Sequence, residues 1–286
     1  MRIYNPAPPI RIYFNCQMNP LLIPAILLGA VQGLTEFLPV SSTAHLTVIP
    51  RLFGWDSPLL NSLAFDVALH TGTLAALLLV VGKDWLNLAP ALLKPRSARG
   101  KFGWGLILAT IPAGLAGLLF EDSVNGTLRG TLYVAFFLAA GALLLWWTDS
   151  RRPGRGVAEK TGIGRALLVG FAQALAILPG LSRSGITITA GMALGLSKKE
   201  AARYSFLLST PLLAAATAWE MRHLPTTAAG DIVPMLAGVV SAGITGTLAL
   251  RWLLGLANRI GYRPFAVYRL ILAASLAIWA AFAGLP

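Results

Sequence analysis

The sequence predicts an all-α protein that crosses a membrane several times as one integral domain. The 286-residue chain is 56% hydrophobic and only 12% charged, whereas about a quarter of the residues in soluble proteins are charged. The windows 102–120, 130–148 and 232–250 contain no Asp, Glu, Lys, Arg or His. Each approaches the roughly 20 residues that a helix needs to cross a bilayer core. Because backbone polar groups must be satisfied internally in hydrocarbon, spans of this length are expected to be helical.

Basic residues in the connections predict how the chain is oriented. Segments 83–103 and 148–165 each hold five Lys or Arg residues, whereas 121–130 holds two acids against one arginine. Cytoplasmic loops of membrane proteins collect Lys and Arg, so the first two segments are predicted to be cytoplasmic and the third external. The same rule places 197–203 and 251–263 in the cytoplasm and 220–231 outside.

The remaining composition limits the classes of partner and site. The net charge of +12 follows from the basic loops, and because no DNA- or RNA-reading motif accompanies it, a nucleic-acid partner is not expected. With the single cysteine Cys16, the chain has no internal disulfide or thiolate metal cluster. Residues 1–19 are predicted to be an N-terminal extension, either disordered or upstream of a true start at Met18 instead of Met1. The membrane domain is assigned to 20–286.

Segment 166–196 does not fit a simple series of spans. It is largely apolar, yet both of its neighbouring connections are basic, and Pro179, Gly180 and Gly185 interrupt its middle. A re-entrant pair of half-helices, entering and leaving on the same side, resolves the count. Such a break is tolerated at membrane depth only where it is buried in protein or lines a wet cavity.

An internal repeat predicts a second broken segment. Residues 25–45 resemble 166–185: Gly29 aligns with Gly170 and Gln32 with Gln173, and after a one-residue gap Ser42 aligns with Ser182. Repeat 1 covers about 20–148 and repeat 2 about 162–284. Each half then holds one broken segment and three spans, so the halves are inverted, with about six transmembrane helices and two re-entrant segments that meet near the midplane.

The two breaks carry the polar chemistry of the chain. Gln32 and Glu36 are spaced i, i+4 and share a helix face. Pro39 ends that helix, Ser41, Ser42 and Thr43 are expected to cap the next, and His45 is close enough to Ser42 for a hydrogen bond. The second break brings Ser182, Arg183, Ser184 and Thr187.

Together these groups predict a phosphate site. Helix N-termini bind anions, arginine binds phosphate oxygens through two parallel hydrogen bonds, and a carboxylate and a histidine supply acid–base capacity near neutral pH. Ionisable groups inside a membrane are functional candidates by default.

Structural interpretations of the same residues remain open. The serines could only cap a helix, Gln32 and Gln173 could join helices by hydrogen bonds, Arg183 could simply neutralise Glu36, and His45 could be an interior histidine. Asp66 and His70, spaced i, i+4 at the start of the next span, are predicted to be a second shell or an entrance pair. Gln173 is predicted to belong to the same outer set.

Two long motifs resemble the signature regions of one family. QGLTEFLPVSSTAH (32–45) and LPGLSRSGITIT (178–189) are similar to those of the undecaprenyl-diphosphate phosphatases, also called bacitracin-resistance proteins. FDVALHTGTLAALL (65–78), EAARYSFLLSTPLL (200–213) and RPFAVYRL (263–270) also resemble family segments, so the resemblance covers about 20–284. Two departures stand out: Gln32 replaces a glutamate and His70 a glutamine seen in many members.

The resemblance implies hydrolysis of a C55 polyprenyl diphosphate to the monophosphate and inorganic phosphate in the bacterial plasma membrane, by a probable homodimer whose site opens to the external face. Glu36, Ser42, His45 and Arg183 inherit functional roles by matched position, with Gln32, Ser182, Ser184 and Thr187 nearby. The residues expected to bind the substrate are these last four together with Ser41 and Thr43.

Two mechanisms are open: attack by Ser42 with His45 accepting its proton, or direct attack by water that Glu36 or His45 activates. No organic cofactor is expected, whereas Mg²⁺ or Ca²⁺ bridging Glu36 and the diphosphate is compatible with the residues. A transporter for a phosphorylated lipid is the alternative function, because inverted repeats with broken helices are also a transporter design.

Overall fold

The computed structural model describes residues 19–55, 57–127, 130–151, 154–221 and 231–283, and this part of the chain is all-helical. Residues 1–18 of the predicted extension 1–19, and 222–230 of the predicted external connection 220–231, lie outside the described residues. In the other predicted external connection, 121–130, only 128–129 lie outside them, and α4 continues to Thr127. The helices are α1 (Leu22–Phe37), α2 (Ser42–Phe53), α3 (Leu63–Leu92), α4 (Ala98–Thr127), α5 (Thr131–Asp149), α6 (Ile163–Ala174), α7 (Arg183–Ala193), α8 (Lys198–Glu220), α9 (Ile232–Ile260) and α10 (Arg263–Ala283), with short 3₁₀ turns at Ala158–Lys160 and Leu175–Ile177.

Five of these helices, α3, α4, α5, α9 and α10, are long and apolar enough to cross a membrane. The chain is therefore a multi-pass membrane protein. About six transmembrane helices were predicted, and the remaining long helix, α8, has 23 residues but a more polar composition. Ser209 and Thr210 each donate to the backbone carbonyl one turn earlier, so these hydroxyls are satisfied within their own helix.

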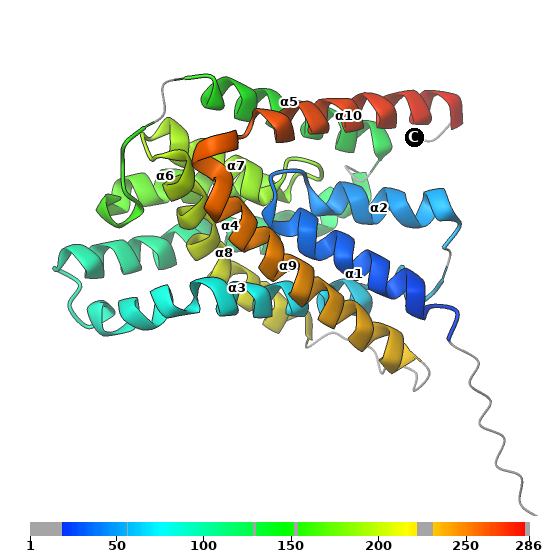
Figure 1. The fold of residues 1–286 in the computed structure, drawn as a ribbon, viewed down its shortest axis with the longest axis horizontal. Coiled ribbons are helices and arrows are strands. Elements are labelled where there is room, and N and C mark those ends of the chain that lie inside the picture. Colours follow the sequence, from blue (N-terminus) through cyan, green and yellow to red (C-terminus); the bar gives the residue numbers. More distant parts are fainter. Residues whose placement is uncertain (1–18, 56, 128–129, 152–153, 222–230, 284–286) are drawn as a thin grey trace, which may run out of the picture.

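Both predicted broken segments are present. The 16-residue α1 and the 12-residue α2 are each too short to span a bilayer core, and the same holds for α6 and α7. In Figure 1, α1 and α2 lie toward one end of the molecule and α6 and α7 toward the other, and the two breaks lie between those ends. This is the arrangement that the inverted repeat predicts.

In each half, the first short helix packs against a spanning helix of the other half. The aligned glycines mark the two contacts, because a Cβ on Gly29 would overlap the backbone of Gly238 in α9, and a Cβ on Gly170 would overlap the backbone of Ala109 in α4. The first short helix of each repeat therefore packs closely against the fourth helix of a repeat: α1 against α9, and α6 against α4. In both cases that helix belongs to the other repeat.

The register of the repeat at the breaks differs from the predicted one. Ser41 and Ser182 are the non-glycine residues with positive φ in the described chain, at 74° and 66°, and each precedes the first residue of its half-helix. The structural partner of Ser182 is thus Ser41, and Ser42 corresponds to Arg183. The offset of 141 that relates the glycines continues through the break, so the predicted one-residue gap was wrong; backbone conformation is a more sensitive guide here than residue identity.

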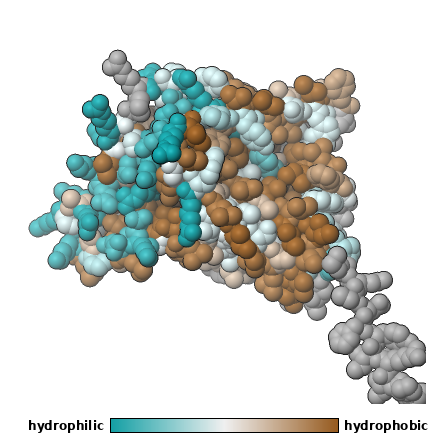
Figure 2. Space-filling view, viewed as in Figure 1, coloured by the Kyte–Doolittle hydropathy of each residue, from teal (hydrophilic) through white to brown (hydrophobic). Residues whose placement is uncertain are grey.

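Charged side chains join the basic connections at one end of the molecule. Arg203 pairs with Asp84 (2.7 Å), Lys198 pairs with Asp149 (2.7 Å), and the amide of Arg263 donates to Asp149 (3.2 Å). Figure 2 shows hydrophilic residues gathered at the end where these connections lie, and mostly apolar surface elsewhere. The four connections predicted to be cytoplasmic therefore share one side.

Candidate active site

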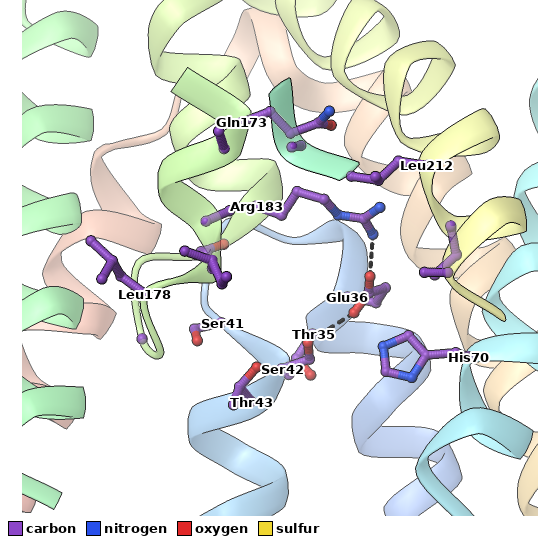
Figure 3. A pocket seen from close by; sticks show the side chains of 18 of the residues that line it. Thr35, Glu36, Ser41, Ser42, Thr43, His70, Gln173, Leu178, Arg183 and Leu212 are labelled. Carbon is purple, nitrogen blue, oxygen red and sulfur yellow. Dashed lines mark hydrogen bonds and ion pairs between the residues drawn. The ribbon is translucent and has the colours of Figure 1, made fainter. Parts of the chain in front are cut away.

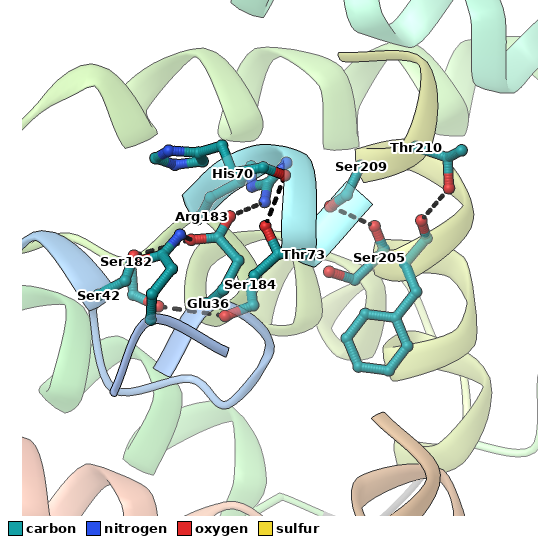
Figure 4. A network of polar contacts seen from close by, with 12 residues as sticks. Glu36, Ser42, His70, Thr73, Ser182, Arg183, Ser184, Ser205, Ser209 and Thr210 are labelled. Carbon is teal, nitrogen blue, oxygen red and sulfur yellow. Dashed lines mark hydrogen bonds and ion pairs between the residues drawn. The ribbon is translucent and has the colours of Figure 1, made fainter. Parts of the chain in front are cut away.

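The two breaks meet at an ion pair between Glu36 of α1 and Arg183 of α7, formed by Oε1 and Nη2. A second link joins the loops, since the Ser184 hydroxyl donates to the carbonyl of Leu38 (3.1 Å). Glu36 is only 8% exposed, and a buried carboxylate needs a cationic or hydrogen-bonding partner. Figures 3 and 4 show both side chains directed toward each other from their separate helices. Residues 147 positions apart thus form one site, as predicted.

The other carboxylate oxygen of Glu36 faces the first break. Its Oε2 accepts from the Ser42 hydroxyl (2.8 Å) and from the Gln32 amide (3.2 Å). The i, i+4 spacing places Gln32 one turn before Glu36, which confirms the predicted shared face. The group placed to accept a proton from Ser42 is therefore Glu36.

Ser41 immediately precedes α2, but its side chain does not cap the helix. It occupies the N-cap position, and its side chain makes no capping hydrogen bond, so the predicted serine cap is wrong for this helix. The positive φ of Ser41 turns the chain sharply, and the hydroxyl of the next residue, Ser42, donates to Glu36 instead of capping the helix. First-turn N–H groups of a helix have no intrahelical partner, which leaves the start of α2 suited to an anion. The Thr43 side chain lines the neighbouring cavity.

At the second break the hydroxyls hold the loop together. Ser182 Oγ accepts from the amide of Gly185 (3.2 Å) and lies 3.3 Å from Ser184 Oγ. Thr187 donates to the carbonyl of Arg183 (2.8 Å) and contacts the Ser205 hydroxyl of α8 (2.6 Å). Among these hydroxyls, Ser182 lines the cavity, whereas Ser184 and Thr187 do not. In this geometry Ser184 and Thr187 position the loop that carries Arg183.

His45 does not form the predicted hydrogen bond with Ser42. Its Nδ1 lies 2.7 Å from the carbonyl of Ser41, and its Nε2 lies 2.6 Å from the Tyr268 hydroxyl of α10. The two rings are also stacked, with centroids 5.7 Å apart. Because a carbonyl only accepts, Nδ1 carries a proton, and the neutral ring accepts from Tyr268. These three contacts turn the imidazole toward α10.

His70 is the histidine that lines the cavity. This cavity has a volume of about 260 Å³, and its lining includes Glu36, Ser42, Arg183 and His70. His70 Nδ1 donates to the carbonyl of Asp66 (2.8 Å), so Nε2 remains for other contacts. An adjoining cavity of about 700 Å³ shares Ser42, Thr43, His70 and Glu220 with the first. It is also lined by Gln32 and Asp66, which fits an entrance position for Asp66.

Comparisons with known proteins identify the family. The model of the family described as bacitracin resistance protein BacA matches residues 25–275. The chain belongs to this family. It is 42% identical over 252 residues to an undecaprenyl-diphosphatase of Caldicellulosiruptor bescii, covering 87% of this chain and 94% of the relative. It is 46% identical over 268 residues to undecaprenyl-diphosphatase 2 of Stutzerimonas stutzeri, covering 90% and 97%. The resemblance seen in the motifs is confirmed.

Sequence reasoning missed a buried arginine in this BacA-family chain. Arg269 of α10 is 0% exposed and donates from Nη2 to the carbonyls of Gly180 (3.2 Å) and Leu181 (2.8 Å). Side chains at Gly141 and Gly185 would collide with its guanidinium. Arg269 thus fixes the backbone just before Ser182 and Arg183. An arginine inside an apolar span was the available signal, since intramembrane charge is functional by default.

Tyr268, the residue beside Arg269, was missed for a different reason. It reaches the other break through His45, and a tyrosine in a membrane helix is too common to attract attention. The adjacent pair on α10 therefore contacts both breaks, one residue each.

The BacA-family site has few groups that could hold a metal ion. The described residues contain no group of three or more His, Cys, Asp or Glu side chains suited to a metal. Both oxygens of Glu36 already have protein partners. This donor set does not fit a resident ion held by the protein alone.

Proposed function

We propose that this chain is a membrane undecaprenyl-diphosphatase. It hydrolyses undecaprenyl diphosphate to undecaprenyl phosphate and inorganic phosphate, recycling the carrier lipid for peptidoglycan synthesis and conferring bacitracin resistance. The observation that carries the chemistry is the Ser42–Glu36–Arg183 arrangement: a hydroxyl, a carboxylate that accepts its hydrogen bond, and a guanidinium, all on one cavity wall. The family match and the names of the relatives supply the substrate.

In the mechanism that this geometry favours, Ser42 is the nucleophile. Its oxygen attacks the terminal phosphorus, its proton passes to Glu36 Oε2 at 2.8 Å, and the bridging P–O bond breaks to release the lipid monophosphate. Glu36 returns its first proton to solvent, and water then attacks the phosphoserine while Glu36 accepts the proton of that water. The Ser42 Oγ–P bond breaks, inorganic phosphate leaves, and Glu36 passes the proton to the Ser42 oxygen. Glu36 thus takes the proton-accepting role that the sequence suggested for His45.

Arg183 stabilises the charge on the phosphoryl oxygens. Before substrate binds, its guanidinium is paired with Glu36, which lowers the energy of both charges in a poorly hydrated site. A diphosphate competes for the same donors, and its parallel oxygens match the guanidinium geometry. N–H groups at the start of α2 add to this field where the negative charge develops.

The rival mechanism has no covalent intermediate: water attacks directly, Glu36 activates it and Ser42 only positions the phosphate. Rapid quenching with a ³²P-labelled diphosphate lipid separates the two. Labelled phosphate on a peptide containing Ser42 supports the covalent route. A Ser42→Ala variant that retains most of its activity would exclude it.

The site is proposed to open toward the external face of the bacterial inner membrane. α8 begins at the end where the basic connections gather and ends at Glu220, which lines both cavities. By the positive-inside rule that second end is external. Hydrolysis of substrate placed only in the outer leaflet of oriented vesicles tests this orientation.

A Mg²⁺ or Ca²⁺ ion at this site would have to be coordinated mainly by the phosphate oxygens of the substrate. Glu36 supplies a carboxylate beside Ser42, and such ions are commonly held by one or two carboxylates plus substrate phosphates. Activity titrated with each ion after chelation tests this proposal.

The resemblance to the family implies a homodimer, which light scattering in detergent measures directly. Release of inorganic phosphate by detergent-solubilised protein separates an enzyme from a pure transporter, because no second compartment exists there.

A further inference from the structure

The Gln173 amide is buried against the cavity without a protein partner. The residue is 1% exposed, and neither Nε2 nor Oε1 has a hydrogen-bond partner among the described residues. Gln173 nevertheless lines the cavity that holds Glu36, Ser42 and Arg183. Figure 3 draws it above Arg183, with Ser42 below. Burying an amide without a partner is costly, and such a group calls for a ligand or another explanation.

The internal repeat explains why this amide has no partner. In the first half, Gln32 donates to Glu36, four residues later on the same helix (3.2 Å). In the second half, the residue four positions after Gln173 is Ile177, which is apolar. The alternative interpretation, that Gln173 joins helices, is not supported either, since its amide contacts no other helix by a hydrogen bond in the described chain.

A second unpartnered group lies on the same cavity. Thr217 of α8 is 4% exposed, and its hydroxyl has no hydrogen-bond partner among the described residues, although it lines the cavity. Thr210, two turns earlier, instead donates to the carbonyl of Phe206 (2.9 Å). A helical threonine normally can make that bond, so the free hydroxyl of Thr217 is an exception on the cavity wall. Leu212 and Leu213 make part of the remaining wall apolar.

We propose that Gln173 and Thr217 form a second phosphate-binding subsite beside Arg183. Amide N–H and hydroxyl groups donate hydrogen bonds to phosphoryl oxygens without adding charge, so the subsite positions a phosphoryl group while Arg183 supplies the charge. Its occupant is either the lipid-linked phosphate of the substrate or the inorganic phosphate that has been released. This inference rests on the proposed diphosphatase function and adds to it the residues that hold a second phosphoryl group.

Gln173→Leu and Thr217→Val remove the donors while keeping most of the side-chain volume. If the lipid-linked phosphate is the occupant, each variant raises KM for the polyprenyl diphosphate in detergent by about 10-fold, the value of one hydrogen bond to a charged group, and lowers kcat less. If released phosphate is the occupant, the inhibition constant of inorganic phosphate rises instead. Thr210→Val is the matched control, because its hydroxyl is satisfied within α8, and neither constant should change.

Thermal unfolding distinguishes this subsite from a structural role. Since the amide has no protein partner, Gln173→Leu should leave the Tm of the free protein unchanged or raise it. Inorganic pyrophosphate should raise the Tm of the unmutated protein and raise that of Gln173→Leu less, a result that does not depend on turnover. A lowered Tm together with unchanged KM and phosphate inhibition overturns the subsite. An unmutated protein that releases no phosphate but is still stabilised by pyrophosphate through Gln173 would reject the enzyme function alone.

Discussion

The two breaks have the same backbone and different side chains. Each has a serine with positive φ, Ser41 or Ser182, immediately before a short half-helix. At the next position one break has Ser42 and the other Arg183, and one turn before the break Glu36 corresponds to Ile177. In the proposed mechanism, the proton acceptor and the nucleophile therefore belong to one half and the cation to the other.

This division shows how a symmetric scaffold holds an asymmetric site. Inverted halves bring equivalent backbone positions together near the middle of the molecule, where identical side chains would place two like charges in contact. Unlike residues at those positions instead give the Glu36–Arg183 pair, in which each charge offsets the cost of burying the other. The repeat sets the backbone geometry of the site, and the side chains that differ between the two halves set its chemistry.

The largest expected effect comes from removing the cation. Arg183→Ala should lower kcat/KM for polyprenyl diphosphate by about 10³-fold or more, as expected for an arginine that stabilises a transferring phosphoryl group. Arg165→Ala, at an exposed arginine near the start of α6, is the control and should retain normal activity. Near-normal phosphate release by Arg183→Ala would show that the second break is not part of the active site.

The corresponding change at the first break tests the proton acceptor. Glu36→Gln keeps the shape but removes the basic oxygen, and should lower kcat by about 10²- to 10⁴-fold, the usual contribution of general base catalysis. Ile177→Val, at the equivalent position of the second break, should change kcat little because no proton moves there. Equal losses at both positions would contradict the division of roles.

Arg269 provides an intermediate effect on stability. Arg269→Met leaves the buried carbonyls of Gly180 and Leu181 without their donor, and should lower the free energy of unfolding in detergent by about 1–3 kcal/mol. Arg259→Met, at an exposed arginine near the end of α9, should change it by less than about 0.5 kcal/mol. Gly141→Ala, which crowds the Arg269 guanidinium, should resemble Arg269→Met; a fully stable Gly141→Ala would count against this role.

The smallest expected effect separates the two positive-φ serines. Ser182→Ala removes a cap hydrogen bond to Gly185 and should lower the free energy of unfolding by about 1 kcal/mol. Ser41→Ala should cost much less, because the Ser41 side chain caps nothing. Thermal or denaturant unfolding of the two variants in one detergent measures the difference. Equal losses would show that the two serines serve their helices in the same way.

Local patterns in the sequence predicted most of the fold and part of the site. Runs without charge predicted the spans, Pro179 and Gly180 predicted the second break, and the basic loops required that break to be re-entrant. These signals can be recognised in the sequence because each depends on a short run of residues and on whether that run lies in water or in hydrocarbon. The pairing of Glu36 with Arg183 followed once the repeat implied that the breaks meet.

Residues whose role depends on distant packing could not be predicted in this way. His45 turns away from Ser42 because Tyr268, 223 residues later, stacks on its ring and donates a hydrogen bond to Nε2. His70, predicted at the entrance, lines the cavity itself. The predicted one-residue gap in the repeat was wrong because the identity of a residue does not reveal its backbone φ angle.

By itself, therefore, the sequence determined the membrane class, the two breaks and the kinds of residue that meet there, since hydrophobicity, charge and Pro or Gly act locally. The tertiary structure alone decided which carboxylate oxygen faces Ser42, which histidine reaches the cavity, and that Arg269 supports the second break. It also decided that Gln173 is left without a partner. These outcomes depend on how helices far apart in the chain pack against one another, and a side chain's partner in a packed interior is set by its neighbours in space rather than in sequence.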